Sequence, residues 1–202
     1  MGTRGLYGIR KNEIDKTTYN HYDSYPEWLG KNMVEFCATT SEEEMNKIYD
    51  KIIMVDESDK PTNEEIAFCI ANGLYDERVS SRSVEDWYCL LRKAQGEISV
   101  LKDLINKNDK AYMIDNSDFI EDSLFCEYAY IINLDTHCLE FYEGFQHEAQ
   151  VGNRYGEKPT TTDYAPDYYY PCRLVMKMPL AEIKNVKEIV QKMSDAVYDK
   201  EE

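Results

Sequence analysis

Residues 19–30, YNHYDSYPEWLG, hold the side chains of this chain that could most readily do chemistry. If a strand continued through them, His21 and Asp23 would point to the same face and could act as an acid–base pair or as metal ligands. The other two histidines, His137 and His147, lie far along the chain, and no second ligand set accompanies them. A catalytic centre is therefore one of two interpretations of this stretch.

The other interpretation is a structural corner, and we favour it because so little else supports a complete catalytic set. Asn20 and Asp23 would bond the amides of a turn, His21 would bond a backbone carbonyl, and Arg4 would pair with Asp23. Pro26 would begin a helix at a position where proline is tolerated. The residues expected to define the corner are Arg4, Tyr19, Asn20, His21, Tyr22, Asp23, Tyr25, Pro26 and Gly30.

Other catalytic patterns are weak in this sequence. A hydrolase with an N-terminal nucleophile needs Cys, Ser or Thr as its first residue, and Thr3 would become first only after the loss of two residues. The sequence contains no phosphate-binding loop, dinucleotide fingerprint, Gly-x-Ser-x-Gly or zinc-protease helix. Its six cysteines form no Cys-x-x-Cys pair, so we expect free thiols that fill gaps in a core. We expect no metal and no other cofactor.

The formal net charge is −16, and most of it lies in two blocks. Residues 41–65 carry nine acidic side chains and three lysines, while residues 111–153 carry nine acidic side chains and no lysine or arginine. Direct binding of nucleic acid needs a basic footprint, so this distribution argues against it. No run approaches the roughly 18 apolar residues of a membrane span, and the N-terminus lacks a signal-peptide pattern, so we expect a cytoplasmic protein.

The pattern of apolar residues predicts a single domain of the α+β class over residues 1–202. A hairpin is expected over residues 4–23, and a helical section over 27–108 separates it from a C-terminal sheet and helix over 111–200. Residues 124–144 alternate apolar and polar side chains, which predicts a second hairpin. With one further strand, these hairpins predict an antiparallel sheet of about five strands packed with four to six helices.

Capping patterns divide the helical section. Ser41, followed by three glutamates, predicts a capping box for a helix that includes Ile52, and its acidic first turn accounts for part of the first acidic block. Thr62 is expected to cap a short helix. Ser83 is expected to cap one long helix or two collinear ones, with Gly96 as a weak point. Residues 144–167 are rich in Gly, Pro and Thr and predict a long loop of the kind that is often functional or disordered.

The opening TRG followed by YNHYDSYPEWLG resembles the start of small uncharacterised proteins encoded by phages, prophages and related mobile elements. The block EYAYIINLDTHCLEFYEG is similar to a second block in the same proteins, and the two blocks cover roughly a quarter of the chain. The resemblance implies a setting inside an infected or lysogenic cell rather than a reaction. Counter-defence or host takeover is the role that this setting implies.

The leading hypothesis is a non-enzymatic acidic protein that binds and inhibits a basic host or defence protein in the host cytoplasm. An acidic, tyrosine-rich face on a rigid hairpin would occupy a basic groove that normally holds nucleic acid, in the manner of an anti-CRISPR protein. The residues expected to contact this partner are Asp118, Glu121, Asp122, Glu127, Asp135, Glu140, Tyr142 and Glu143. The alternative is a small hydrolase or small-molecule-binding protein that uses His21 and Asp23. The oligomeric state stays open.

Overall fold

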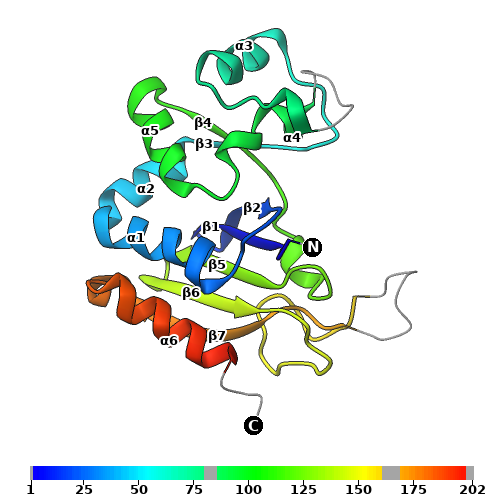
Figure 1. Ribbon diagram of the computed structural model, residues 1–202, viewed down its shortest axis with the longest axis vertical. Coiled ribbons are helices and arrows are strands. Elements are labelled where there is room, and N and C mark those ends of the chain that lie inside the picture. Colours follow the sequence, from blue (N-terminus) through cyan, green and yellow to red (C-terminus); the bar gives the residue numbers. More distant parts are fainter. Residues whose placement is uncertain (1, 80–85, 161–168, 199–202) are drawn as a thin grey trace.

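The structure, a computed structural model, describes residues 2–79, 86–160 and 169–198. A five-stranded sheet forms its centre (Figure 1). The strands lie in the order β2 (Ile14–Asn20), β1 (Gly5–Lys11), β5 (Tyr128–Asn133), β6 (Cys138–Glu143) and β7 (Arg173–Pro179). The expected α+β class is confirmed.

The sheet is mixed, which corrects the expectation of an antiparallel one. Strands β1 and β5 run parallel, with Tyr7 opposite Tyr130, while the other neighbours are antiparallel. The free edge of β2 is occupied, because the Asn116 amide donates a hydrogen bond to the Thr17 carbonyl. Strand β1 therefore has β2 on one side and the parallel strand β5 on the other.

A second sheet of two strands is a feature that the sequence analysis missed. Strands β3 (Ile52–Val55) and β4 (Ala111–Ile114) run parallel, with Val55 opposite Ile114. Helix α2 (Glu42–Lys51) ends directly before β3, so the expectation that Ile52 belongs to the helix is wrong. β-Branched side chains favour a strand wherever a partner strand is available, and β4 supplies that partner here.

Six α-helices lie within the described residues. Besides α2 they are α1 (Lys31–Thr39), α3 (Asn63–Ala71), α4 (Trp87–Leu90), α5 (Ile98–Asn108) and α6 (Val186–Tyr198). Shorter helical turns are η1 (Pro26–Gly30), η2 (Glu77–Val79), η3 (Arg92–Ala94), η4 (Phe119–Glu121) and η5 (Leu180–Glu182). The capping box of Ser41 and the cap at Thr62 are confirmed, and Thr62 also forms a full capping box, since each hydroxyl accepts from a first-turn amide and a glutamate accepts from each cap amide.

The expected long helix is broken into α4, η3 and α5. Gly96 separates η3 from α5 with a φ of 81°, a conformation that ends a right-handed helix. Ser83, the predicted cap, lies outside the described residues, and Asp86 caps α4 by accepting a hydrogen bond of 2.8 Å from the Tyr88 amide. Gly96 is thus a break point rather than only a weak one.

The two faces of the large sheet are packed by different material. On the helical face, Tyr7, Tyr130 and Phe141 pack in the main apolar core with side chains from the helices. On the opposite side, which we call the outer face, Leu6 and Ile131 belong to a smaller apolar cluster that also contains residues from η4 and the segment before β7. No helix in the described ranges is long and apolar enough to cross a membrane.

Candidate functional site: a corner groove and an acidic surface

The inner side of the corner, residues 19–30, is structural. Asn20 and Ser24 are buried, and the Asn20 side-chain amide donates to the Tyr22 carbonyl at 2.6 Å and to the Ser24 hydroxyl at 2.8 Å. Tyr130 donates to the Ser24 carbonyl at 3.0 Å. A Cβ added at Gly30 would lie 2.8 Å from the Tyr130 ring, so this position needs glycine for close packing. These contacts attach the corner to the centre of the sheet.

His21 and Asp23 do not form an acid–base pair. Strand β2 ends at Asn20, and Asp23 has a φ of 55°, so the two side chains are not carried on one strand. His21 Nδ1 is hydrogen-bonded to the Tyr19 hydroxyl at 3.0 Å rather than to a backbone carbonyl. Partial burial lowers the pKa of His21, and the charges of two nearby arginines, Arg92 and Arg4, lower it further.

The proposed pair of Arg4 and Asp23 is not formed. The Arg4 guanidinium lies over the Phe125 ring, 4.5 Å from its centroid. The Asp23 carboxylate makes no hydrogen bond or ion pair with any other described residue, although the backbone carbonyl of Asp23 accepts from Leu29. Asp23 is exposed and faces a different feature, a groove beside the corner.

This groove, which has a volume of about 550 Å³, lies between the corner and the chain around Gly96. The corner and the start of α1 supply Asn20, Tyr22, Asp23, Trp28, Leu29 and Asn32, and the facing segments supply Asp76, Val79, Arg92, Lys93, Gln95, Gly96 and Glu97. His21 is not part of the lining. Large concave sites with converging polar groups are where ligands usually bind, so the groove is the first candidate site.

Gly96 is held in the floor of the groove by two hydrogen bonds of its own. Its amide donates to the Tyr7 hydroxyl at 3.0 Å, and that hydroxyl donates to the Ala94 carbonyl at 3.1 Å. Its carbonyl accepts from Asn32 Nδ2 at 3.3 Å. A Cβ at Gly96 would lie 2.9 Å from Asn20 Oδ1, so a side chain here would collide with the corner. The helix break therefore serves to bring this segment against the corner.

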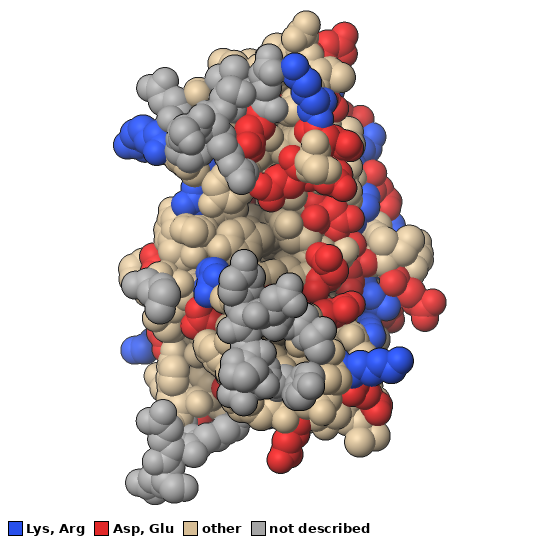
Figure 2. All heavy atoms as spheres, turned by 90° about the vertical axis from the view of Figure 1, so that its right-hand side faces the viewer, with Lys and Arg blue, Asp and Glu red and all other residues tan. Residues whose placement is uncertain are grey.

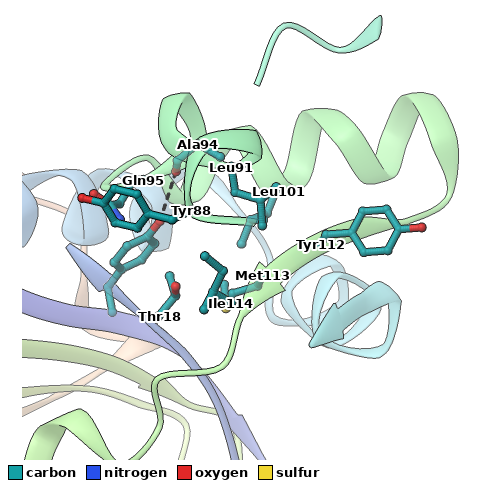
Figure 3. A pocket seen from close by; sticks show the side chains of 10 residues that line it. Thr18, Tyr88, Leu91, Ala94, Gln95, Leu101, Tyr112, Met113 and Ile114 are labelled. Atoms are coloured by element: carbon teal, nitrogen blue, oxygen red, sulfur yellow. Dashed lines mark hydrogen bonds between the residues drawn. The ribbon is translucent and has the colours of Figure 1, made fainter. Parts of the chain in front are cut away.

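A much smaller hollow lies on the other side of the Tyr7–Ala94 hydrogen bond, which is the dashed line in Figure 3. Its volume is about 20 Å³, close to the space that one water needs. Leu91 and Leu101 point into it, whereas the Tyr112 ring points away. This hollow is too small for a substrate, and we regard it as a packing feature.

Some of the charged side chains on the groove wall already make contacts within the protein, and others do not. The Arg92 guanidinium lies 5.1 Å from the centre of the Tyr22 ring and donates to Gln95 Oε1. The Asp76 carboxylate accepts two hydrogen bonds of 3.1 Å from the Arg78 side chain, which help to lower its pKa to about 2. The carboxylates of Asp23 and Glu97 have no such partner within the described residues.

The hairpin that the sequence analysis favoured does not present a free acidic face. Glu140 is fully buried, and its carboxylate accepts from both Arg154 side-chain amino groups, at 2.7 and 3.2 Å. It also accepts from Asn133 at 3.0 Å and from Tyr142 at 2.9 Å. Tyr142 is itself only 2% exposed. The expectation that Glu140 and Tyr142 contact a partner is therefore wrong.

The physical reason is the segment that follows the hairpin. Residues 145–160 and 169–172 lie on the outer face, where Tyr155 donates to Asp15 at 3.0 Å and Asn153 donates to the Cys172 carbonyl at 3.0 Å. This segment carries Arg154 back onto a hairpin that has no lysine or arginine of its own, and Lys177 of the neighbouring strand β7 lies 3.5 Å from Glu140 Oε1 as well. The middle of the predicted loop, residues 161–168, lies outside the described residues.

The other predicted contact residues fall into two groups. Three of them are partly buried. Glu127 accepts a hydrogen bond from the Arg4 amide at 3.1 Å, and Glu143 forms an ion pair with Arg173. Asp122 is partly buried as well, and this burial raises its pKa. Asp135 is exposed but bonds the amides of the β1–β2 turn. Asp118 and Glu121 are exposed as well.

Asp118 and Glu121 belong to a surface that combines both acidic blocks. The Asp115 amide donates to the Val55 carbonyl at 2.9 Å, so the turn after β3 and the turn after β4 are adjacent. Both strands end on the side that faces the viewer in Figure 2, where Asp and Glu side chains form a band. We define the acidic surface as the exposed residues Asp56, Asp59, Asp115, Asp118 and Glu121.

Sequence reasoning missed the residues that make these two features. Trp28 was part of the quoted corner and Gly96 was singled out, but nothing indicated that the two would meet across a groove. The β-branched residues of β3 were the available signal for the pairing that joins the acidic blocks. Within the described residues, no group of three or more His, Cys, Asp or Glu side chains is placed to hold a metal ion.

Comparison with known protein families, with curated proteins and with solved structures finds no match to this chain. The resemblance to mobile-element proteins therefore stays a prediction. The functional argument depends on the groove and the acidic surface themselves.

Proposed function

We propose that this protein is a non-enzymatic acidic binding protein whose acidic surface occupies a basic site on a partner protein. The observation that carries the proposal is the pairing of β3 with β4, which joins acidic turns from two distant parts of the sequence. Neither turn alone forms a surface of this size. The proposal keeps the leading hypothesis but moves its contact surface away from the hairpin.

Electrostatics gives this surface a specific mode of action. Five exposed carboxylates on the two adjacent turns and on η4 produce a concentrated negative field that speeds association with a basic groove and repels nucleic acid. A basic groove that normally holds nucleic acid is the complementary site, because it is shaped for an array of negative charges. The mobile-element resemblance supports a counter-defence setting, in which the partner is a nuclease or a nucleic-acid-guided defence complex.

The test is an affinity capture from host-cell lysate with three forms of the protein, followed by identification of the bound proteins. The surface variant neutralises the acidic surface by D56N, D59N, D115N, D118N and E121Q. The control variant removes the same charge elsewhere by E35Q, E43Q, D103N, E182Q and D195N. We expect the wild type and the control to bind a basic protein, and duplex DNA and high salt to release it.

The surface variant is expected to bind that protein at least about tenfold more weakly, because the steering field is lost. Equal binding by the surface variant and the control would overturn the proposal. Capture that is indifferent to both salt and DNA would do the same, since it would show that charge does not drive the interaction.

A second candidate function, binding of a small group at the corner, is favoured by the groove of about 550 Å³. The hydrolase form of this candidate lacks its proposed chemistry, because His21 lies outside the groove and bonds Tyr19. Thr3 is buried and its carbonyl accepts from the Ser24 amide, so it has no access as a nucleophile. The groove therefore supports recognition rather than hydrolysis.

A further inference from the structure

We infer that the groove beside the corner receives an arginine side chain of the partner, which stacks on Trp28 and pairs with Asp23 and Glu97. This inference rests on the proposed function, because it names the chemical group by which a basic partner is recognised. It adds a specific socket, built from residues other than those of the acidic surface, to a protein whose acidic surface acts by charge alone.

Trp28 is the first part of the argument. Its side chain is 64% exposed, whereas its neighbours Pro26, Leu29 and Gly30 are buried and hold the η1 turn in place. An exposed indole held by a buried turn is the best aromatic platform for a cation. Trp and Arg are also the residue types most often found at the energetic centre of an interface.

The unsatisfied polar atoms of the groove are the second part. The carboxylates of Asp23 and Glu97 make no hydrogen bond or ion pair within the described residues. Asn20 is 4% exposed, and its side-chain amide donates hydrogen bonds to Tyr22 and Ser24. Its Oδ1 accepts from no described residue and lies beside Gly96 in the groove floor. All three groups are acceptors, so they match a ligand that is rich in donors.

A guanidinium fits this description better than other groups. It carries five N–H donors and no acceptor, and its planar form stacks on an indole while it pairs with carboxylates. An ammonium would satisfy the charge but would lack the planar stack. A ligand carboxylate or phosphate would meet Asp23 and Glu97 as like charges, which disfavours anions.

The cations of the groove do not block this arrangement. The Arg92 guanidinium is held against the rings of Tyr22 and Tyr88, 5.1 and 5.6 Å from their centres, and bonds Gln95. The Lys93 side chain is exposed, and its charge helps to lower the pKa of Asp76 on the same wall of the groove. The Trp28 side of the groove is therefore open to an incoming cation.

The experiment measures binding of a blocked Gly-Gly-Arg-Gly-Gly peptide by tryptophan fluorescence and by the NMR signal of the Trp28 indole. Trp87, the second tryptophan, is 1% exposed, so the exposed Trp28 dominates any change. The same peptide with citrulline has nearly the same shape without the charge. We expect citrulline to weaken binding at least about tenfold and lysine to weaken it less.

Two sets of variants complete the test. The double variant D23N and E97Q is expected to weaken binding of the arginine peptide at least about tenfold, and W28F is expected to weaken it and to remove the fluorescence change. A second control, the double variant D103N and E182Q, removes two acidic side chains outside the groove and is expected to bind the arginine peptide normally. Equal binding of arginine and citrulline, or no signal up to about 10 mM peptide, would overturn the inference.

The surface variant distinguishes this inference from the proposed function. If the groove variants still capture the partner while the surface variant does not, the arginine socket is wrong and the acidic surface stands. If the groove binds the arginine peptide but the surface variant captures the partner as well as the wild type, the socket stands and the proposed function is wrong.

Discussion

The acidic side chains of the β5–β6 hairpin and those of the acidic surface come from equally acid-rich sequence, yet they have opposite roles. Glu140 is buried and satisfied by four hydrogen bonds from other side chains, whereas Asp56, Asp59 and Asp115 remain exposed beyond the ends of β3 and β4. The difference comes from what covers each region. An acid on a sheet face is available to a partner only if no later segment packs on that face.

Removal of the buried acid should give the largest effect. Glu140→Ala leaves Arg154, Asn133 and Tyr142 without their shared acceptor, and we expect the free energy of unfolding to fall by about 3 kcal/mol. Urea denaturation of Glu140→Ala and of Glu121→Ala measures the contrast, because Glu121 belongs to the acidic surface. The surface substitution should change stability by less than about 0.5 kcal/mol. Similar losses in the two variants would remove the distinction between the regions.

Acidification should also distinguish the buried Glu140 from the exposed acids of the acidic surface. Burial of Glu140 opposes its charged form, but the hydrogen bonds and charge of Arg154, together with the hydrogen bonds from Asn133 and Tyr142, outweigh burial, and the pKa of Glu140 lies below its ordinary value. A depressed carboxyl pKa contributes stability above the unfolded value of about 4.3, and this contribution is lost as the pH falls through the folded value.

Glu140→Gln removes this titration, so its unfolding free energy should decline less steeply than that of the wild type as the pH falls below about 4.3. Urea denaturation across the acid range measures the two slopes. Identical slopes for Glu140→Gln and the wild type would show that Glu140 carries no pH-dependent stability. Glu121→Gln is the matched control, since it removes an exposed acid of the same type.

The sequence predicted the fold to the extent that local pattern determines it. The alternation from Tyr128 to Phe141, the capping box at Ser41, the cap at Thr62 and the α+β class are all present in the structure. A distant segment decides which residues are buried on the second face of a strand. Alternation alone therefore predicted that the polar face of the hairpin is exposed to solvent. The Arg154–Glu140 pair illustrates this, because no local pattern links the two residues.

The candidate site was predictable only in parts. The corner was predicted to be structural, and Asn20 and Ser24 are buried there, but Asn20 donates to a carbonyl and a hydroxyl instead of accepting from turn amides. The groove needs Tyr7 and Asn32 to hold Gly96, and the acidic surface needs β3 to pair with β4. Both features are long-range contacts between residues with ordinary local roles, which single-sequence periodicity does not encode.

Asp135 is intermediate between the two regions. It is exposed, as the residues of the acidic surface are, but its carboxylate is hydrogen-bonded, as that of Glu140 is. Its carboxylate accepts from the amides of Asn12 and Glu13 at 2.7 and 2.9 Å, and both of those residues have positive φ. Asp135→Ala should lower the free energy of unfolding by about 1 kcal/mol, since each exposed hydrogen bond contributes modestly. Asp118→Ala is the control and should cost less than about 0.5 kcal/mol.

Amide hydrogen exchange separates the two explanations of such a loss. If Asp135 stabilises the β1–β2 turn, the Asn12 and Glu13 amides should exchange faster in Asp135→Ala while those of β5 remain protected. If only the overall negative charge matters, Asp135→Ala and Asp118→Ala should both leave the turn unchanged and should shift stability equally. That result would mean that exposure alone, rather than bonding, decides what an acidic residue contributes in this protein.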